Sequence, residues 1–124
     1  MSKINKYEML SEFCKVYSDF RDYIVDSSNE WISLDGRFMW IVITSSLAEF
    51  VLNKIKVGNY DDVDEFFLLI ERLVIEGDLE VSTLVTTELL ESMMNNKTIE
   101  GELWRPFLRE KSLEYCIQID DFNN

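Results

Sequence analysis

The side chains with the greatest chemical potential in this sequence are carboxylates, and they are densest between Asp61 and Glu65, where the sequence reads DDVDE. Such a run is typical of the start of a calcium-binding loop. A complete loop also needs a glycine at its sixth position and a glutamate at its twelfth. Counted from Asp61, these positions hold Phe66 and Arg72. The sequence therefore argues against calcium binding here.

The residues needed for other chemistry are missing from the sequence. It contains no histidine, which excludes Ser-His-Asp and Cys-His catalysis and removes the usual general base at neutral pH. Two cysteines cannot complete a tetrahedral zinc site, and no glycine-rich phosphate-binding motif occurs. Glu71 and Glu91 could pair across two helices, but no ExxH motif accompanies them as a di-iron bundle requires. We interpret both as structural helix-surface residues and predict a protein without enzymatic activity, metal or cofactor.

The negative charge is concentrated in one region of the chain. The net charge is −12, and residues 61–102 hold twelve acids and two bases. Residues 1–60 and 103–124 each carry a net charge of only −1. This region is either a solubilising face or a docking surface for a basic partner. Nucleic acid is an unfavourable ligand, because its phosphates would be repelled.

Length and composition predict an all-α protein. A chain of 124 residues corresponds to one domain, residues 1–124. Apolar residues make up 47% of it, which excludes a disordered chain. One proline and four glycines favour long helices over a many-turned β-sandwich. We therefore predict a single-domain bundle of about five helices.

The predicted bundle is organised around Phe38–Leu52, where Glu49 is the only charged residue. This apolar stretch is too short to span a bilayer as a helix, which needs ~20 residues. It predicts a buried central helix over about residues 36–56, capped by Ser33 or Asp35 and ended by Gly58.

Before this stretch, one continuous helix is predicted from Asn5 to Asp26, with Trp31 following in a short loop. Apolar residues recur there at spacings of three and four, which marks one helical face. They are Tyr7, Leu10, Phe13, Cys14, Tyr17, Phe20 and Ile24.

After the central stretch, the sequence predicts an antiparallel αα-hairpin over about residues 60–94. Asn59 or Asp61 can cap its first helix, and Asp78 its second. Gly77 is expected to end the first helix in the left-handed conformation. Almost no chain separates the two helices, so they must be antiparallel neighbours.

The C-terminal region is predicted to contain a short amphipathic turn around Trp104 and a last helix capped by Ser112. Pro106 fits the first position of a helix. Residues 117–119 are the only place where we would tolerate a strand, and residues 120–124 are expected to fray.

Cysteine usage and the N-terminus favour the cytoplasm. Cys14 and Cys116 form no CxxC pair, and we interpret both as small buried apolar residues in a reducing compartment. A disulfide between them is the alternative. The beginning MSKINKYEML lacks the apolar segment of a signal peptide.

Residues 64–91 contain a set of short motifs, Phe66-Phe67, Ile70-Glu71, Glu76-Gly77-Asp78 and Leu90-Glu91. Through these motifs, this part of the sequence resembles small helical bacterial proteins built from HEAT-like hairpins. The whole chain, which is small, acidic and helical, also resembles the immunity proteins of contact-dependent inhibition and polymorphic toxin systems. Those proteins bind and neutralise a cognate toxin, often a basic nuclease, and the resemblance transfers no functional residue.

These observations favour an immunity protein that binds a basic protein toxin, without direct contact to nucleic acid or membrane. A helical adaptor or regulator, or an inhibitor that mimics DNA, is the alternative, and the oligomeric state is left open. Trp31 and Trp104 are candidate aromatic anchors for the partner, although tryptophans in such positions are more often residues at the edge of the core. The predicted partner-binding residues are Tyr60, Asp61, Asp62, Asp64, Glu65 and Glu80.

Overall fold

The structure is a computed structural model that describes residues 3–123, and it is helical throughout. Eight α-helices, one π-helical segment and two 3-10 turns make up this part of the chain, which otherwise shows only isolated β-bridges. The all-α prediction is confirmed, and the helices share one apolar core. The predicted number of about five helices is wrong, because two expected helices are each divided and a short helix, Ser28–Trp31, replaces an expected loop. Across residues 3–123, no helix is both long and apolar enough to cross a membrane.

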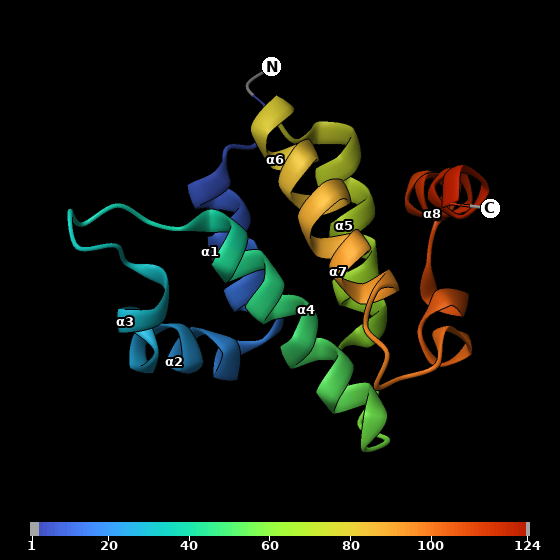
Figure 1. Ribbon diagram of the computed structural model, residues 1–124, viewed down its shortest axis with the longest axis horizontal. Coiled ribbons are helices and arrows are strands. Elements are labelled where there is room, and N and C mark those ends of the chain that lie inside the picture. Colours follow the sequence, from blue (N-terminus) through green and yellow to red (C-terminus); the bar gives the residue numbers. More distant parts are fainter. Residues whose placement is uncertain (1–2, 124) are drawn as a thin grey trace.

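Helix α4 (Trp40–Lys56) occupies the centre of the fold, as predicted. Figure 1 shows it running diagonally across the molecule, and it contacts α2, α3, α7 and the π-helical segment η1. One side of α4 still faces solvent, where Ile41 is 58% exposed. The buried side consists of Ile43, Thr44, Leu47, Ala48, Val51, Leu52 and Ile55.

The ends of α4 differ in how well they follow the prediction. The helix begins after Met39, which provides no side-chain cap. Ser33 and Asp35 instead belong to a turn before the helix, where the Arg37 amide donates to the Ser33 hydroxyl at 3.2 Å. The predicted caps are therefore wrong. Gly58 ends the helix as predicted, with a φ of +83° that a side chain would disfavour.

The first predicted helix is broken at Tyr17 into α1 (Lys6–Val16) and α2 (Ser18–Asp26). Tyr17 adopts extended backbone angles and is 3% exposed. Its ring packs edge-on against Phe50 of α4, with ring centroids 5.8 Å apart. The bend lets α1 pack on α5 while α2 packs on α4. The short helix α3 (Ser28–Trp31) then replaces the predicted loop.

The predicted hairpin is present, and its second arm is subdivided. Helix α5 (Val63–Glu76) forms the first arm, and α6 (Leu79–Thr83), η1 (Leu84–Leu90) and α7 (Glu91–Met94) form the second. Figure 1 shows the two arms side by side. Asp78 caps the second arm as predicted, with its carboxylate accepting from the Val81 amide at 2.9 Å. The cap of α5 is Asp62 rather than the predicted Asn59 or Asp61, and its side chain makes no capping bond.

The π-helical segment η1 is a widened turn that the apolar pattern did not predict. It begins where the hydroxyl of Thr86 donates to the Ser82 carbonyl at 2.7 Å. The Thr83 hydroxyl donates in the same way to the carbonyl of Leu79 at 2.8 Å. Side-chain bonds to the i−4 carbonyl compete with the backbone ladder of an α-helix. This competition loosens the helix at the position where the wide turn starts.

The C-terminal region packs against the outer side of α5, as Figure 1 shows. Two 3-10 turns, η2 (Gly101–Leu103) and η3 (Arg105–Phe107), precede α8 (Glu110–Asn123). Pro106 is the second residue of η3, one position after the predicted first position. Residues 117–119 are helical, so the tolerated strand is wrong. Residues 120–123 continue the helix rather than fray, and Asn124 lies outside the described residues.

The predicted left-handed Gly77 is a second correction in the hairpin. Its φ is −70°, which any residue can adopt. A glycine is required there for space, because an added Cβ would lie 2.4 Å from the Leu73 carbonyl oxygen and 2.5 Å from Val81 Cγ1. The Gly77 segment also pairs with the N-terminal residue Ile4, which accepts from the Asp78 amide at 2.9 Å. A close backbone approach therefore replaces the left-handed turn.

We predict that Gly77→Ala lowers the free energy of unfolding by about 1–3 kcal/mol, because the new methyl group must displace packed atoms. The measurement is chemical denaturation followed by circular dichroism. Gly58→Ala is the control, since no atom lies within 4 Å of its added Cβ and only the left-handed backbone costs about 1 kcal/mol. A Gly77→Ala protein as stable as the wild type would contradict the close approach.

Candidate functional site

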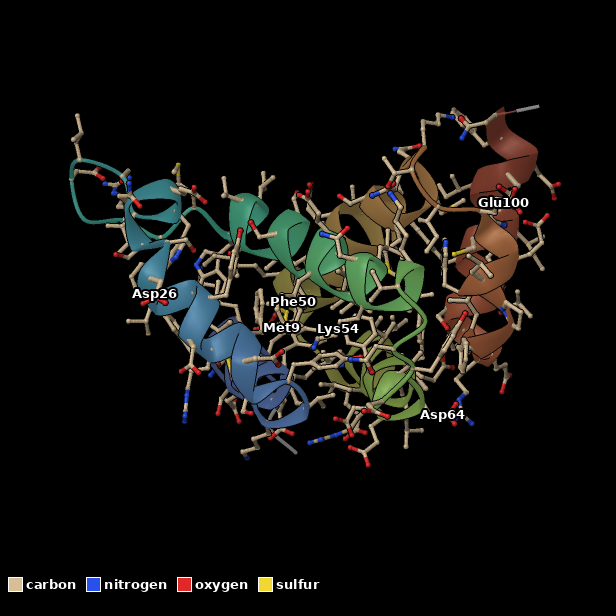
Figure 2. The ribbon with its side chains drawn as sticks, turned by 90° about the horizontal axis from the view of Figure 1, so that it is seen from below. Met9, Asp26, Phe50, Lys54, Asp64 and Glu100 are labelled. Atoms are coloured by element: carbon tan, nitrogen blue, oxygen red, sulfur yellow. The ribbon has the colours of Figure 1, made fainter. Side chains whose placement is uncertain are left out.

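Five of the six predicted partner-binding residues lie together where α4 passes into α5. Tyr60, Asp61 and Asp62 occupy the connection, and Asp64 and Glu65 occupy the first turn of α5. All five side chains are exposed. Figure 2 shows Asp64 at the edge of the molecule, pointing away from the core. The four carboxylates at positions 61, 62, 64 and 65 are called the 61–65 patch below.

Glu80 is not part of this patch. It lies on α6, at the opposite end of the hairpin. Helix α5 is 14 residues long, which at 1.5 Å per residue places about 20 Å between Glu80 and the patch. Its carboxylate accepts from the Lys6 ammonium at 3.1 Å. The predicted set is therefore divided into two separate locations.

The backbone holds the 61–65 patch in a defined shape. The Asn59 side chain accepts from the Asp61 amide at 3.1 Å. Asp62 has a φ of +62°, a conformation that aspartate tolerates better than most residues. Acids in the first turn of α5 are stabilised by the helix dipole. None of the four carboxylates takes part in a hydrogen bond or ion pair found within residues 3–123, so all four face solvent.

Tyr17 lies inside the fold, close enough to the patch for its negative charge to affect the Tyr17 pKa. Its hydroxyl lies 3.5 Å from the Asp61 carbonyl. Burial raises the pKa of Tyr17, and the charges of Asp62, Asp19 and Asp61 raise it further. Because these charges oppose formation of a tyrosinate, Tyr17 stays neutral. Its hydroxyl group points its hydrogen at the Asp61 carbonyl.

The aromatic residues predicted to contact the partner are mostly part of the core. Tyr60 is 43% exposed and stacks on Phe107 with ring centroids 5.9 Å apart. Trp104 is 1% exposed and stacks on Phe67. Trp31 is 8% exposed, and its indole donates to the Ile24 carbonyl at 2.7 Å. Both tryptophans are buried, which supports the core-edge interpretation and argues against a role as surface anchors.

The carboxylates considered as a catalytic pair, Glu71 and Glu91, both hold α8 in place. Glu71 accepts from the backbone amides of Lys111 at 2.7 Å and Ser112 at 2.9 Å. It therefore caps a helix from another part of the chain. Glu91 accepts from the hydroxyl of Tyr115 at 2.8 Å. Ser112, the predicted cap, lies inside the first turn, where its hydroxyl accepts from the preceding Arg109 amide.

A third polar contact of α8 is an ion pair with the preceding segment η3. The Arg105 guanidinium donates to both Asp120 oxygens, at 2.6 and 3.2 Å. These bonds lower the pKa of Asp120, because they favour the charged carboxylate.

Both cysteines are free thiols, so the alternative of a disulfide between them is not realised. Cys116 is buried as predicted, and burial raises its pKa to about 11. Cys14 is half-buried, and burial also raises its pKa. Catalytic cysteines need a lowered pKa, so neither thiol is an activated nucleophile. Over residues 3–123, no group of three or more acidic or cysteine side chains is arranged to hold a metal ion.

A second exposed feature is a groove that sequence reasoning missed. It has a volume of about 450 Å³ and lies between the start of α4 and the second arm of the hairpin. The helical spacing places Ile41 and Leu79 on apolar helix faces that are expected to be buried, yet both are exposed and are the two exposed apolar residues of the groove. The hydroxyl-rich stretch VSTLVTT at residues 81–87 was the signal for the irregular helix below it. The groove is lined by Ile41, Leu79, Glu80, Thr83, Leu84 and Glu88.

The fold and these surfaces define a small all-helical protein with an acidic patch and a separate apolar groove. The chain belongs to the family described as a domain of unknown function, DUF7674, whose model matches residues 9–124. No curated protein and no solved structure matches it.

We predict that Glu71→Ala destabilises the protein by about 1–2 kcal/mol, because two amides of α8 lose their acceptor. Hydrogen exchange should accelerate first at Lys111 and Ser112, which the carboxylate covers. Glu49→Ala, an exposed acid on α4, is the matched control and should change neither quantity. Equal effects of the two substitutions would show that Glu71 does not cap α8.

We predict that iodoacetamide at neutral pH modifies Cys14 slowly and leaves Cys116 unmodified until the protein unfolds. The raised pKa of Cys116 keeps its sulfur protonated, and burial blocks access. Mass spectrometry of native and urea-treated protein measures both sites. Modification of Cys116 as fast as Cys14 in native protein would contradict its burial.

Proposed function

We propose that this protein is an immunity protein that binds and neutralises a basic bacterial protein toxin through its acidic surface. The observation that supports the proposal best is the 61–65 patch. It presents four exposed carboxylates within five residues, and no intramolecular partner found in residues 3–123 uses them. The proposed action is binding alone, without catalysis or a cofactor.

The physical role of the patch is to steer association. A dense negative patch attracts a cationic surface and raises the association rate well above that of a neutral pair. In the cleft of a basic nuclease, these carboxylates would take the positions of substrate phosphates. Tyr60, at the edge of the patch and partly exposed, adds an aromatic contact that charge alone does not provide.

We place this action in the cytoplasm. Both cysteines are free thiols, which is the state that a reducing compartment maintains. A toxin that attacks intracellular targets would be met there.

The proposal can be tested with two variants that lose the same charge from different faces. The patch variant carries Asp61→Asn, Asp62→Asn, Asp64→Asn and Glu65→Gln. The control variant carries Asp22→Asn, Asp26→Asn, Glu30→Gln and Glu49→Gln, all exposed acids on α2, α3 and α4. Figure 2 shows Asp26 and Asp64 well separated. Asparagine tolerates the left-handed backbone at position 62, so both variants should fold.

The partner is first identified by pull-down from the native cell, with washes at low and then high salt and identification by mass spectrometry. Stopped-flow association is then measured against salt. We predict that the patch variant associates at least about tenfold more slowly at low salt and with a weaker salt dependence. The control variant should stay close to wild type.

Two outcomes would contradict the proposal. Equal association rates for the two variants would exclude steering by the 61–65 patch. Recovery of many DNA-binding proteins, rather than one basic protein, would support the alternative of an inhibitor that mimics DNA.

A further inference from the structure

The groove between α4 and the second hairpin arm combines apolar walls with acidic edges. Leu79 is 84% exposed and Ile41 is 58% exposed, and they face the groove together with Leu84. Exposed apolar residues that gather around a hollow mark interaction surfaces more often than isolated ones do. Glu80 and Glu88 lie along the same groove. The groove therefore offers apolar contact and negative charge at one place.

A separate aromatic hollow, lined by Tyr7 and Trp40, lies on the α1 side of the groove. Lys6 connects the two, because its ammonium binds Glu80 at 3.1 Å and lies 5.6 Å from the centre of the Trp40 ring. Tyr7 packs edge-on against the same ring at 5.4 Å. The Lys6–Glu80 pair thus lies between the groove and the aromatic hollow, whereas no ion pair or hydrogen bond found within residues 3–123 uses the Glu88 carboxylate.

The wall of the groove is the irregular part of the fold. Leu84 and Glu88 belong to the π-helical segment η1, and Thr83 immediately precedes it. π-helical turns are rare and occur frequently at functional sites. The wide turn sets the spacing between Leu84 and Glu88.

We propose that this groove binds a basic amphipathic helix of the partner protein, with apolar side chains against Ile41 and Leu79 and a lysine or arginine at Glu88. This inference rests on the proposed function, because it takes the partner to be a basic protein. It locates the hydrophobic anchor of the complex about one helix length away from the 61–65 patch. The patch would set the association rate, and the groove would set the lifetime of the complex.

The shape and charge of the groove select this occupant. Its hairpin wall runs from Leu79 to Glu88, about 13 Å of helix, which accommodates two to three turns of a docked helix. Residues 3–123 offer no sheet edge to which an extended peptide could pair. A second copy of this chain would bring a net charge of −12 against acidic edges, and nucleic acid would be repelled for the same reason.

The probe is a fluorescein-labelled amphipathic peptide of about 15 residues, long enough to form a helix. Leucines occupy one face and lysines the other. One control peptide replaces every lysine with glutamate, and a second replaces every leucine with serine. Binding is measured by fluorescence anisotropy at ~0.15 M salt, where the Debye length is about 8 Å and long-range attraction to the acidic protein is screened. Both control peptides should bind at least about tenfold more weakly.

Matched variants locate the site. Ile41→Ser with Leu79→Ser should weaken binding by about tenfold or more, because two apolar contacts are lost. The control pair is Ile75→Ser with Val57→Ser, which are 55% and 80% exposed and outside the groove. It should change affinity by less than about twofold. All four residues are exposed, so circular dichroism should show unchanged folding.

A third variant, Glu88→Gln, tests the charge. It should weaken the lysine peptide by about threefold to fivefold, the size of a modest ion-pair contribution. It should leave a peptide with glutamine in place of lysine unaffected. Chemical shifts of ¹⁵N-labelled protein should move most at Ile41, Thr83 and Glu88 when the lysine peptide is added.

Three results would overturn the inference. Equal weakening by the two apolar pairs would show that the peptide does not bind specifically at the groove, and shifts centred on the 61–65 patch would show that it is attracted to that charge. Either result would leave the proposed function standing. Concentration-dependent self-association that Ile41→Ser with Leu79→Ser abolishes would make a second copy the occupant. Conversely, the groove variants could lose peptide binding while the patch variant associates with the partner as fast as the wild type. That result would support binding in the groove and reject steering by the 61–65 patch.

Discussion

Covering the apolar side of α4 is the constraint on which the rest of the structure depends. Seven of its residues are buried, and no single neighbour can cover them all. The chain solves this from two directions. It bends at Tyr17, so that α2 reaches α4 while α1 stays on α5, and it packs η1 and α7 along the other side. Tyr17 joins these contacts, since its ring meets Phe50 on α4 and Phe66 on α5. The bend and the widened helix are both ways of fitting straight elements around one buried helix.

The sequence predicted features that depend on neighbouring residues and missed those that depend on distant ones. Asp78 and Gly58 act within one helical turn, so their capping roles could be read from local order. No glycine or proline near Tyr17 indicates the break, and the helical spacing of apolar residues continues through it. From the sequence alone, Trp31 and Trp104 cannot be told from surface aromatic residues. Their contacts with Ile24 and Phe67, which are distant or unpredicted in the sequence, show that they are buried.

The same distinction applies to the candidate surfaces. Asp61 to Glu65 are adjacent in the chain, so their clustering was predictable, as was their exposure. Glu80 was grouped with them on charge alone, and the length of α5 separates it. The groove is assembled from residues 41 and 79–88, which are far apart in sequence. No local pattern encodes such a surface, because it exists only once α4 and the hairpin are packed together.

The attachment of α8 has a consequence for the cooperativity of the fold. This helix contributes few buried side chains, chiefly Ser112 and Cys116, and is fixed by directional polar contacts from Glu71, Glu91 and Arg105. Hydrogen bonds to charged groups such as these each add about 1.5–3 kcal/mol, and water can replace them when the helix opens. We therefore expect the last helix to open at a lower free energy than the core and to close again without disturbing it. Such sub-global opening would give the protein two native-like states that differ only in whether the outer side of α5 is covered.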